Sequence, residues 1–206
     1  MLFNPDSRSA NLLIPGLVAI LLTFSGTLLA AFSIVRERER GTLEQLIVSP
    51  VRSIELVIGK IVPYLAIGYV QMTIVLLVGT RVFSVPFAGS WALLYGMAAL
   101  FIAANLALGL FFSTLARTQQ QAMQMSFFFM LPSILLSGFM FPFEGMPAFA
   151  RGIGSAIPLT HFLRIIRGIV LRGATVGDLL PEVGWLAGIT GVLVAASALR
   201  FQKKLG

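Results

Sequence analysis

The sequence predicts an all-α fold, a polytopic transmembrane helical domain of about five spans, and three observations favour it. Hydrophobic residues make up 57% of the 206-residue chain and charged residues only 11%, whereas a soluble domain is usually about 25% charged. The mean hydropathy is +0.93. Apolar runs close to the roughly 20 residues that a bilayer-spanning helix needs recur along most of the chain. We therefore expect one membrane domain over residues 1–206.

The first predicted span, residues 11–35, is uncharged and ends at the cluster Arg36-Glu37-Arg38-Glu39-Arg40. Its Pro15 falls in the first helical turn, where a missing N–H group costs little. Residues 1–10 lack a basic n-region, so we expect this run to stay in the membrane rather than to be removed as a signal peptide. The second predicted span, about residues 61–80, follows Lys60, whose long side chain can reach the headgroups.

Two further predicted spans, residues 91–116 and about 122–143, are separated by a short polar turn that contains Arg117. Because the connection is so short, we expect an antiparallel helical hairpin. Pro132 predicts a kink within the second of these helices. The last predicted span covers about residues 183–199.

The segment before the last span, residues 144–182, carries four arginines among many apolar residues. Within it, residues 159–172 place an apolar stripe broadly opposite His161, Arg164, Arg167 and Arg172. This pattern is typical of an amphipathic helix that lies in the membrane interface, or of a shallow re-entrant helix. We expect it at the outer leaflet, with the His161 ring at the interface.

The basic residues predict the orientation, because loops on the cytoplasmic side carry an excess of Lys and Arg. With the N-terminus outside and the C-terminus inside, the basic residues on the cytoplasmic side are Arg36, Arg38, Arg40, Arg52, Lys60, Arg117, Arg200, Lys203 and Lys204. The formal net charge of +7 does not indicate nucleic acid, since the basic residues lie beside apolar runs. Anionic lipid headgroups are the expected counter-charge.

A short cytoplasmic helix is predicted between the first two spans. Gly41 suits the left-handed residue that ends a helix, and Thr42 with Gln45 forms a capping-box pattern for a new one, which Ser49-Pro50 would stop. Its apolar residues Leu43, Leu46 and Ile47 share one face, and so short a helix needs a surface to dock on. That surface is either the membrane and this chain's own helix ends, or a partner protein.

Several segments resemble those of ABC-2-type permeases. The run from Val35 to Leu46, followed by Ser49-Pro50 and Gly59-Lys60, is similar to the cytoplasmic loop signature of that family. Residues 115–122, 136–142 with Met146-Pro147, and 157–162 with Ile166-Arg167-Gly168 agree in content and order. The similarity covers nearly the whole chain and matches the C-terminal membrane part of the subfamily that carries a large external domain. Those relatives begin with an additional membrane helix and that domain, before the equivalent of Asn4-Pro5. Whether this part is lost, separately encoded or never present is left open.

The resemblance implies a multi-pass permease of the inner (plasma) membrane, which exports an apolar or amphipathic drug or lipid. It would pair with a second copy or a paralogue and with a separate ABC ATP-binding subunit that holds ATP and Mg²⁺, while this chain would bind no cofactor itself. Residues 42–49 would be the coupling helix. The partner-binding residues expected on this basis are Glu37, Arg38, Glu39, Arg40, Gly41, Thr42, Leu43, Glu44, Gln45, Leu46 and Ile47.

Enzyme classes find little support in the sequence. No GxxxxGK[S/T] loop occurs, because Gly59-Lys60 is followed by Ile61, so ATP must bind elsewhere. The single histidine, His161, has no ligand partners at metal spacing, and no span carries an acidic residue near its centre. A lipid-headgroup enzyme that uses the outer arginines lacks a general base. A non-transporting scaffold or assembly subunit is the other alternative. Gly184 and Gly188 form a GxxxG pattern that predicts close helix packing, within or between subunits.

Overall fold

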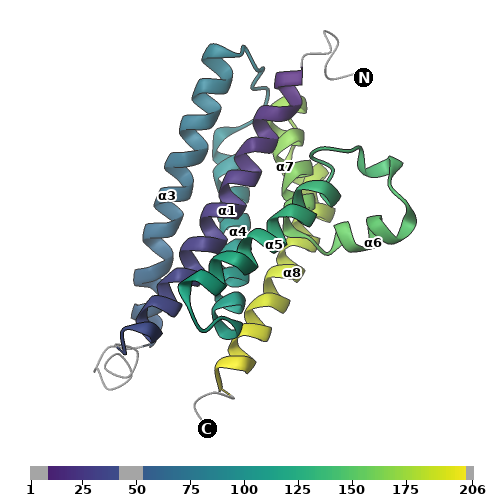
Figure 1. Cartoon of the computed structure of the whole chain (residues 1–206). Coiled ribbons are helices and arrows are strands. Elements are labelled where there is room, and N and C mark those ends of the chain that lie inside the picture. The colour runs from purple at the N-terminus through teal and green to yellow at the C-terminus, as the bar shows by residue number, and fades with distance from the viewer. Residues whose placement is uncertain (1–8, 42–52, 203–206) are drawn as a thin grey trace.

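A computed structural model describes residues 9–41 and 53–202, with side chains for residues 10–41 and 61–200. The described part is helical and contains no strand, which confirms the predicted fold class (Figure 1). Its elements are α1 (Ser9–Glu39), α3 (Ser53–Val82), α4 (Trp91–Leu115), α5 (Gln119–Leu136), the 3₁₀ turn η1 (Phe143–Gly145), α6 (Ala148–Ser155), α7 (Pro158–Arg172) and α8 (Val176–Gln202).

Four of these helices are long and apolar enough to cross a bilayer, namely α1, α3, α4 and α8. The bent pair α6 and α7, which turns by 83°, brings the number to five if it counts as one broken span. Helix α5, which corresponds to the fourth predicted span, is not among these candidates, because its 18 residues open on Gln119, Gln120 and Gln121. It ends at Leu136 rather than near residue 143 as expected, because Gly138 takes a left-handed φ of +87° and turns the chain away.

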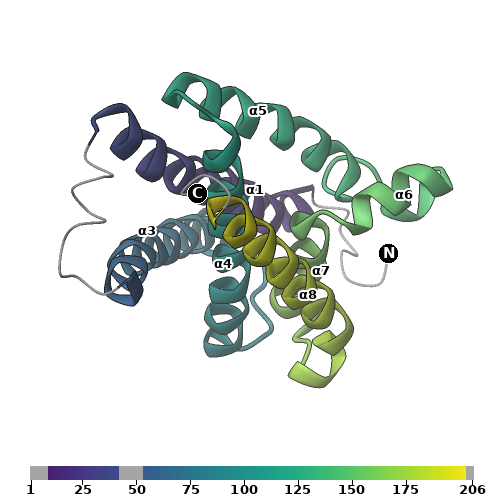
Figure 2. The same cartoon turned by 90° about the horizontal axis from the view of Figure 1, so that it is seen from below.

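Helices α1 and α4 form the buried centre of the bundle. Seen from below, α3 and α6 lie on opposite sides of it (Figure 2). In the most apolar window of each helix, 61% of α1 and 67% of α4 is buried, against 17% of α3 and 11% of α8. The two central helices approach closely at Gly109, where an added Cβ would lie 2.4 Å from the carbonyl oxygen of Thr27. The absence of a side chain at Gly109 therefore sets the distance between α1 and α4.

Helix α7 is the amphipathic helix that the sequence predicts over residues 159–172, but it is buried more deeply than expected. Most of its side chains are enclosed by α1, α4 and α8. Phe162 stacks on Phe101 of α4 with ring centroids 4.0 Å apart. Gly173, at a φ of +63°, ends the helix in the left-handed conformation typical of a C-terminal cap. The helix is thus part of the core, and its predicted depth in the bilayer stays a prediction.

Two groups of helix ends lie at opposite ends of the bundle. The start of α1, the connection between α3 and α4, and the connection between α7 and α8 lie at the upper end in Figure 1. The end of α1, the turn between α4 and α5, and the end of α8 lie at the lower end. Two interactions agree with this arrangement, since Arg38 of α1 bonds to Ala116 and Arg200 of α8 lies over the Phe111 ring.

Candidate functional site

The lower end of α1 is the part of the predicted coupling region that the structure describes. Gly41 has a φ of +67°, which confirms that it takes the left-handed conformation expected where the helix ends. Its N–H group donates to the carbonyl oxygen of Arg38 at 3.2 Å. Arg36, Arg40 and Gly41 are exposed. The helix therefore presents a charged, accessible end next to residues 42–47.

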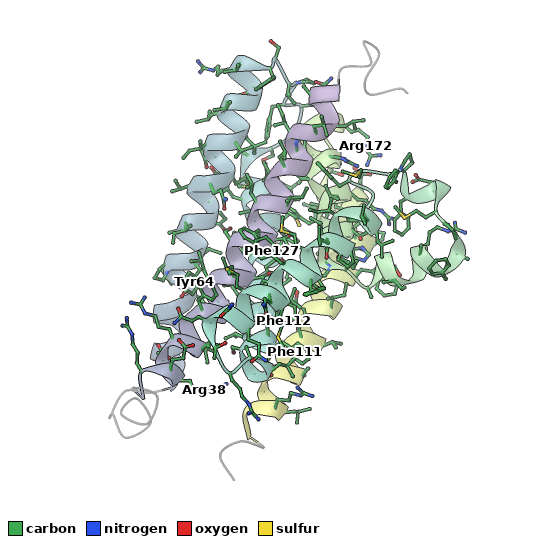
Figure 3. The ribbon with its side chains drawn as sticks, viewed as in Figure 1. Arg38, Tyr64, Phe111, Phe112, Phe127 and Arg172 are labelled. Atoms are coloured by element: carbon green, nitrogen blue, oxygen red, sulfur yellow. The ribbon has the colours of Figure 1, made fainter. Side chains whose placement is uncertain are left out.

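Arg38 caps the end of α4. Its Nη1 donates to the carbonyl oxygens of Ser113 at 3.1 Å and Ala116 at 2.9 Å. The last carbonyl groups of a helix have no partner within that helix and carry the negative end of its dipole, so a guanidinium is well suited to this position. Figure 3 shows Arg38 at the lower end of the bundle, close to α4.

Glu39 contacts the beginning of the next helix. Its Oε1 accepts a hydrogen bond from the Gln119 backbone N–H at 2.8 Å, and its Oε2 accepts from the Gln119 side-chain amide. Thr118 caps the same helix, because its hydroxyl accepts from the Gln121 N–H at 3.2 Å. A carboxylate is favourable at a helix N-terminus, where unpaired N–H groups point outward. Arg38 and Glu39 together hold both sides of the α4–α5 turn.

These contacts add to what the sequence indicated for the charged cluster. We expected Glu37, Arg38, Glu39 and Arg40 to orient a partner, and the structure shows that Arg38 and Glu39 bond to this chain's own α4–α5 turn. A local sequence pattern could not predict this contact, because Arg38 and Ala116 are 78 residues apart. The rest of the expected contact surface, Thr42, Leu43, Glu44, Gln45, Leu46 and Ile47, lies outside the described residues. Its role stays a prediction.

A buried polar cluster at the upper end joins α7 to α8. We expected the His161 ring at the interface, but the residue is only 2% exposed. Its Nδ1 lies 2.6 Å from Glu182 Oε2 and its Nε2 lies 2.8 Å from the carbonyl oxygen of Ser155. Because both ring nitrogens face oxygen acceptors, both bonds form only if the ring is doubly protonated or the carboxyl carries the proton. His161 is therefore buried with polar partners inside the protein and is not exposed at the membrane interface.

Glu182 is the residue that sequence reasoning missed. It bonds to His161, and its Oε1 accepts from Arg164 Nη1 at 3.0 Å. A signal exists, because Glu182 is the last acidic residue of the chain and begins an otherwise uncharged apolar run. The sequence does not show which helix it faces, however, since His161 and Arg164 lie about 20 residues earlier on a different helix.

The predicted outer arginines have different surroundings. Arg164 is paired with Glu182 and lies over the Phe143 ring, with its Cζ 4.5 Å from the centroid. Arg167 donates from Nη1 to the carbonyl oxygen of Gly138 at 3.0 Å. Arg172 is exposed on the last turn of α7, in the upper part of the bundle (Figure 3). Two of the three therefore face the segment that follows α5.

Gly184 and Gly188 do not pack against another described helix. An added Cβ at either position would meet no atom within 4 Å. Both line a shallow hollow on the outer face of α8 together with Ala156, Trp185 and Ile189. The close helix packing that the GxxxG pattern predicts is thus not found among the described residues. This surface of α8 is therefore available for contact with another subunit.

Polar residues within the long helices bond either to a neighbouring helix or to a carbonyl of their own helix. The hydroxyl of Ser25 in α1 donates to Gln71 Oε1 of α3 at 2.8 Å. The side chain of Asn105 in α4 donates to the Phe101 carbonyl oxygen at 2.8 Å and packs beside Gly26 of α1. Gln71 thus joins α3 to α1, and Asn105 lies at the contact between α4 and α1.

The helices long and apolar enough to span, joined through a shared buried core, define a multi-pass membrane protein. Residues 1–199 match the family model described as "ABC-2 family transporter protein". The chain belongs to this family.

Three relatives illustrate the similarity. The chain is 36% identical over 203 residues to the probable multidrug ABC transporter permease YbhR of Escherichia coli K12, and the match covers 98% of this chain and 55% of the relative. It is 33% identical to the probable multidrug ABC transporter permease YbhS of the same organism, with 98% and 54% covered. It is 27% identical to the linearmycin resistance permease protein LnrN of Bacillus subtilis, with 97% and 48% covered. The chain spans about half the length of these curated relatives.

Proposed function

We propose that this chain is the membrane-spanning permease subunit of an ABC exporter, which moves an apolar or amphipathic drug or lipid while a separate subunit hydrolyses ATP. Membership of the ABC-2 family is the observation that carries the proposal. Two of the curated relatives are named probable multidrug ABC transporter permeases. The given sequence contains no GxxxxGK[S/T] loop, so the proposal assigns ATP binding to a separate subunit.

Helix α1 provides a path for the energy of ATP hydrolysis. It runs for 31 residues without interruption, which corresponds to about 46 Å at 1.5 Å per residue. Its lower end adjoins the predicted coupling segment at residues 42–49, and Arg38 and Glu39 tie this end to α4 and α5. A force on the coupling segment would therefore reach three helices at once. Transport requires inward and outward states of similar free energy that such a force can bias.

The arrangement of the helices supports the proposed orientation, with the N-terminus outside. Arg36, Arg40 and Arg117 are exposed near the end of α1 and the α4–α5 turn, at the end where α8 also finishes. Arginines also lie at the upper end, namely Arg81, Arg164, Arg167 and Arg172. The orientation therefore depends on the dense cluster from Arg36 to Arg40, because such a cluster beside a span favours the cytoplasmic side. Because the sequence contains no cysteine, an Arg40→Cys variant should react with a membrane-impermeant thiol reagent only after lysis, and a Phe149→Cys variant in intact cells. Labelling in the reverse order would contradict this orientation.

Coupling to an ATPase can be measured directly. The chain is purified with an ABC ATP-binding subunit from the same cells and reconstituted in vesicles of bacterial polar lipid. We expect ATP turnover to change when a transported amphipathic drug is added, and to lose this response in the Leu43→Asp/Leu46→Asp double variant. A Leu13→Asn variant, altered at an exposed position near the opposite end of α1, serves as the control for expression and insertion.

The outcomes separate the exporter from the scaffold alternative. An ATP-binding subunit whose turnover is the same with and without this chain would indicate a scaffold or assembly subunit. Wild-type drug response in the double variant would contradict the docking role of residues 42–49. In either case membrane insertion of the variants is checked first, because a variant that fails to insert tests neither proposal.

A further inference from the structure

A cavity of about 330 Å³ lies in the upper part of the bundle, between α7 and the segment that follows α5. Cavities that hold small molecules usually measure about 300–1,000 Å³, so its size suits a ligand group. Its wall consists of Leu12 of α1, residues 137–144, and Leu163, Arg164 and Arg167 of α7. In Figure 1 this is the side where the chain bulges between α5 and α6.

The loop that roofs the cavity is held in place by close contacts. Phe139 lies against Gly16 of α1, where an added Cβ would be 2.4 Å from the Phe139 ring. Phe143 lies against Gly154 of α6, where an added Cβ would be 2.9 Å from that ring. The carbonyl oxygen of Gly138 accepts the bond from Arg167. The loop that forms this wall of the cavity therefore contacts α1, α6 and α7.

The charge on the cavity wall is positive and only partly neutralised. Arg164 is paired with Glu182, but within the described residues no carboxylate lies within 4.0 Å of Arg167. Arg167 uses two of its N–H groups, on the carbonyl oxygens of Gly138 and Leu12, and a guanidinium carries five. Its Nε is buried and has no acceptor. Glu144 lines the cavity but is exposed and forms no ion pair with either arginine.

The remaining wall is apolar and open to the surroundings. Met140 is 58% exposed and Phe141 is 55% exposed, and both line the cavity beside Leu163 and Phe139. Leu12 lies in the first turn of α1, at the beginning of the candidate span that starts at Ala10. Because a span begins near the headgroups, we expect Arg167, which bonds to Leu12, at headgroup depth and the exposed apolar side chains beside the acyl chains.

We infer that this cavity binds an anionic amphiphile, with its phosphate or carboxylate group on Arg167 and its apolar chain on Phe141 and Met140. Anionic oxygens are the acceptors that a guanidinium binds most strongly, often through two parallel bonds. Arg164 supplies a second positive charge at the edge of the same cavity. The proposal concerns binding alone, so it goes beyond the exporter function and does not depend on it.

Binding is measured on the full chain in phosphatidylcholine nanodiscs by native mass spectrometry, with dioctanoyl phosphatidylglycerol as the probe. We expect one tightly held phosphatidylglycerol, and at least tenfold weaker retention of dioctanoyl phosphatidylcholine. In the Arg167→Gln variant the affinity for phosphatidylglycerol should fall about tenfold, whereas Arg167→Lys should keep part of it. Arg151→Gln removes the same charge from an exposed position on α6 outside the cavity and should leave the affinity unchanged.

Two further arms identify the ligand class. If the apolar chain contributes, Phe141→Ser should weaken phosphatidylglycerol binding about threefold or more, and its exposed position leaves folding intact. Inorganic phosphate at millimolar concentration should not displace the lipid. Displacement by phosphate alone would overturn the amphiphile assignment, because it would indicate a free-anion site. Equal losses in Arg167→Gln and Arg151→Gln would overturn the site itself, since only a general charge effect would then remain.

Discussion

The two ends of the bundle use charge in different ways. At the lower end, Arg38 and Glu39 bond to main-chain groups at the end of α4 and the start of α5, and Glu39 is exposed. At the upper end, His161 and Glu182 bond to each other inside the protein, with side-chain exposures of 3% and 21%. The Arg38 contacts are partly buried and those of Glu39 are exposed. Such contacts of charges with helix ends contribute little free energy, whereas removal of one partner from a buried pair is costly. The lower end is thus suited to rearrangement, and the upper end is suited to fix α7 against α8.

The largest expected effect is at the upper end. We expect Glu182→Ala to lower the free energy of unfolding by about 3 kcal/mol, because it leaves the buried His161 and the partly exposed Arg164 without their acceptor. Thermal unfolding in detergent, followed by scanning fluorimetry, measures this loss. Glu144→Gln, an exposed carboxylate without an ion pair in the described residues, is the control. A Glu182→Ala variant as stable as wild type would mean that the two ends do not differ as described.

The link between the ends can be tested at the α1–α4 crossing. Gly109→Ala should cost about 2 kcal/mol, because the new Cβ would lie 2.4 Å from the Thr27 carbonyl oxygen and would force the central helices apart. Gly188→Ala is the matched control, since its Cβ would meet nothing within 4 Å. The same unfolding assay applies. Equal tolerance of both substitutions would show that the central helices can separate without loss.

The smallest effect is expected at the lower end. Arg38→Gln removes the cap on Ser113 and Ala116 and should cost about 1 kcal/mol, the usual value of a helix-end contact. Arg36→Gln, an exposed arginine two residues earlier, should be within experimental error of wild type. Despite the small stability change, we expect Arg38→Gln to reduce drug-stimulated ATP turnover in the reconstituted complex. Unchanged turnover would indicate that α4 and α5 receive motion by another contact.

The elements of the fold were largely predictable, and the exceptions have local causes. The start of α4 at Trp91 and the left-handed Gly41 follow from capping residues and glycine geometry, which act within a few positions. Helix α5 ends seven residues earlier than its apolar run, at Leu136 instead of 143, because hydropathy alone does not show that Gly138 turns the chain. The apolar residues after Leu136 are not helical and instead form part of the wall of the cavity at the upper end.

The sites were less predictable, because their residues are distant in the sequence. The pattern of α7 indicated an amphipathic helix and singled out His161, Arg164 and Arg167, but it did not indicate burial or the partner Glu182. An apolar stripe shows that one face of a helix avoids water, but it does not show whether that face packs against lipid or against the protein core. Likewise, the cluster around Arg38 predicted a charged helix end without showing its contacts across 78 residues.

Composition and local pattern by themselves determined that this chain is a helical membrane protein, roughly where most of its long helices lie, and which family it resembles. These properties depend on the free energy of transfer of apolar side chains into lipid and on helix capping, and a short stretch of sequence is enough to show both. Tertiary structure alone decided that His161 and Glu182 are partners, that Arg38 and Glu39 hold the α4–α5 turn, and that a cationic cavity forms at the upper end. Each of these depends on which helices are neighbours, and that is set by packing over the whole chain.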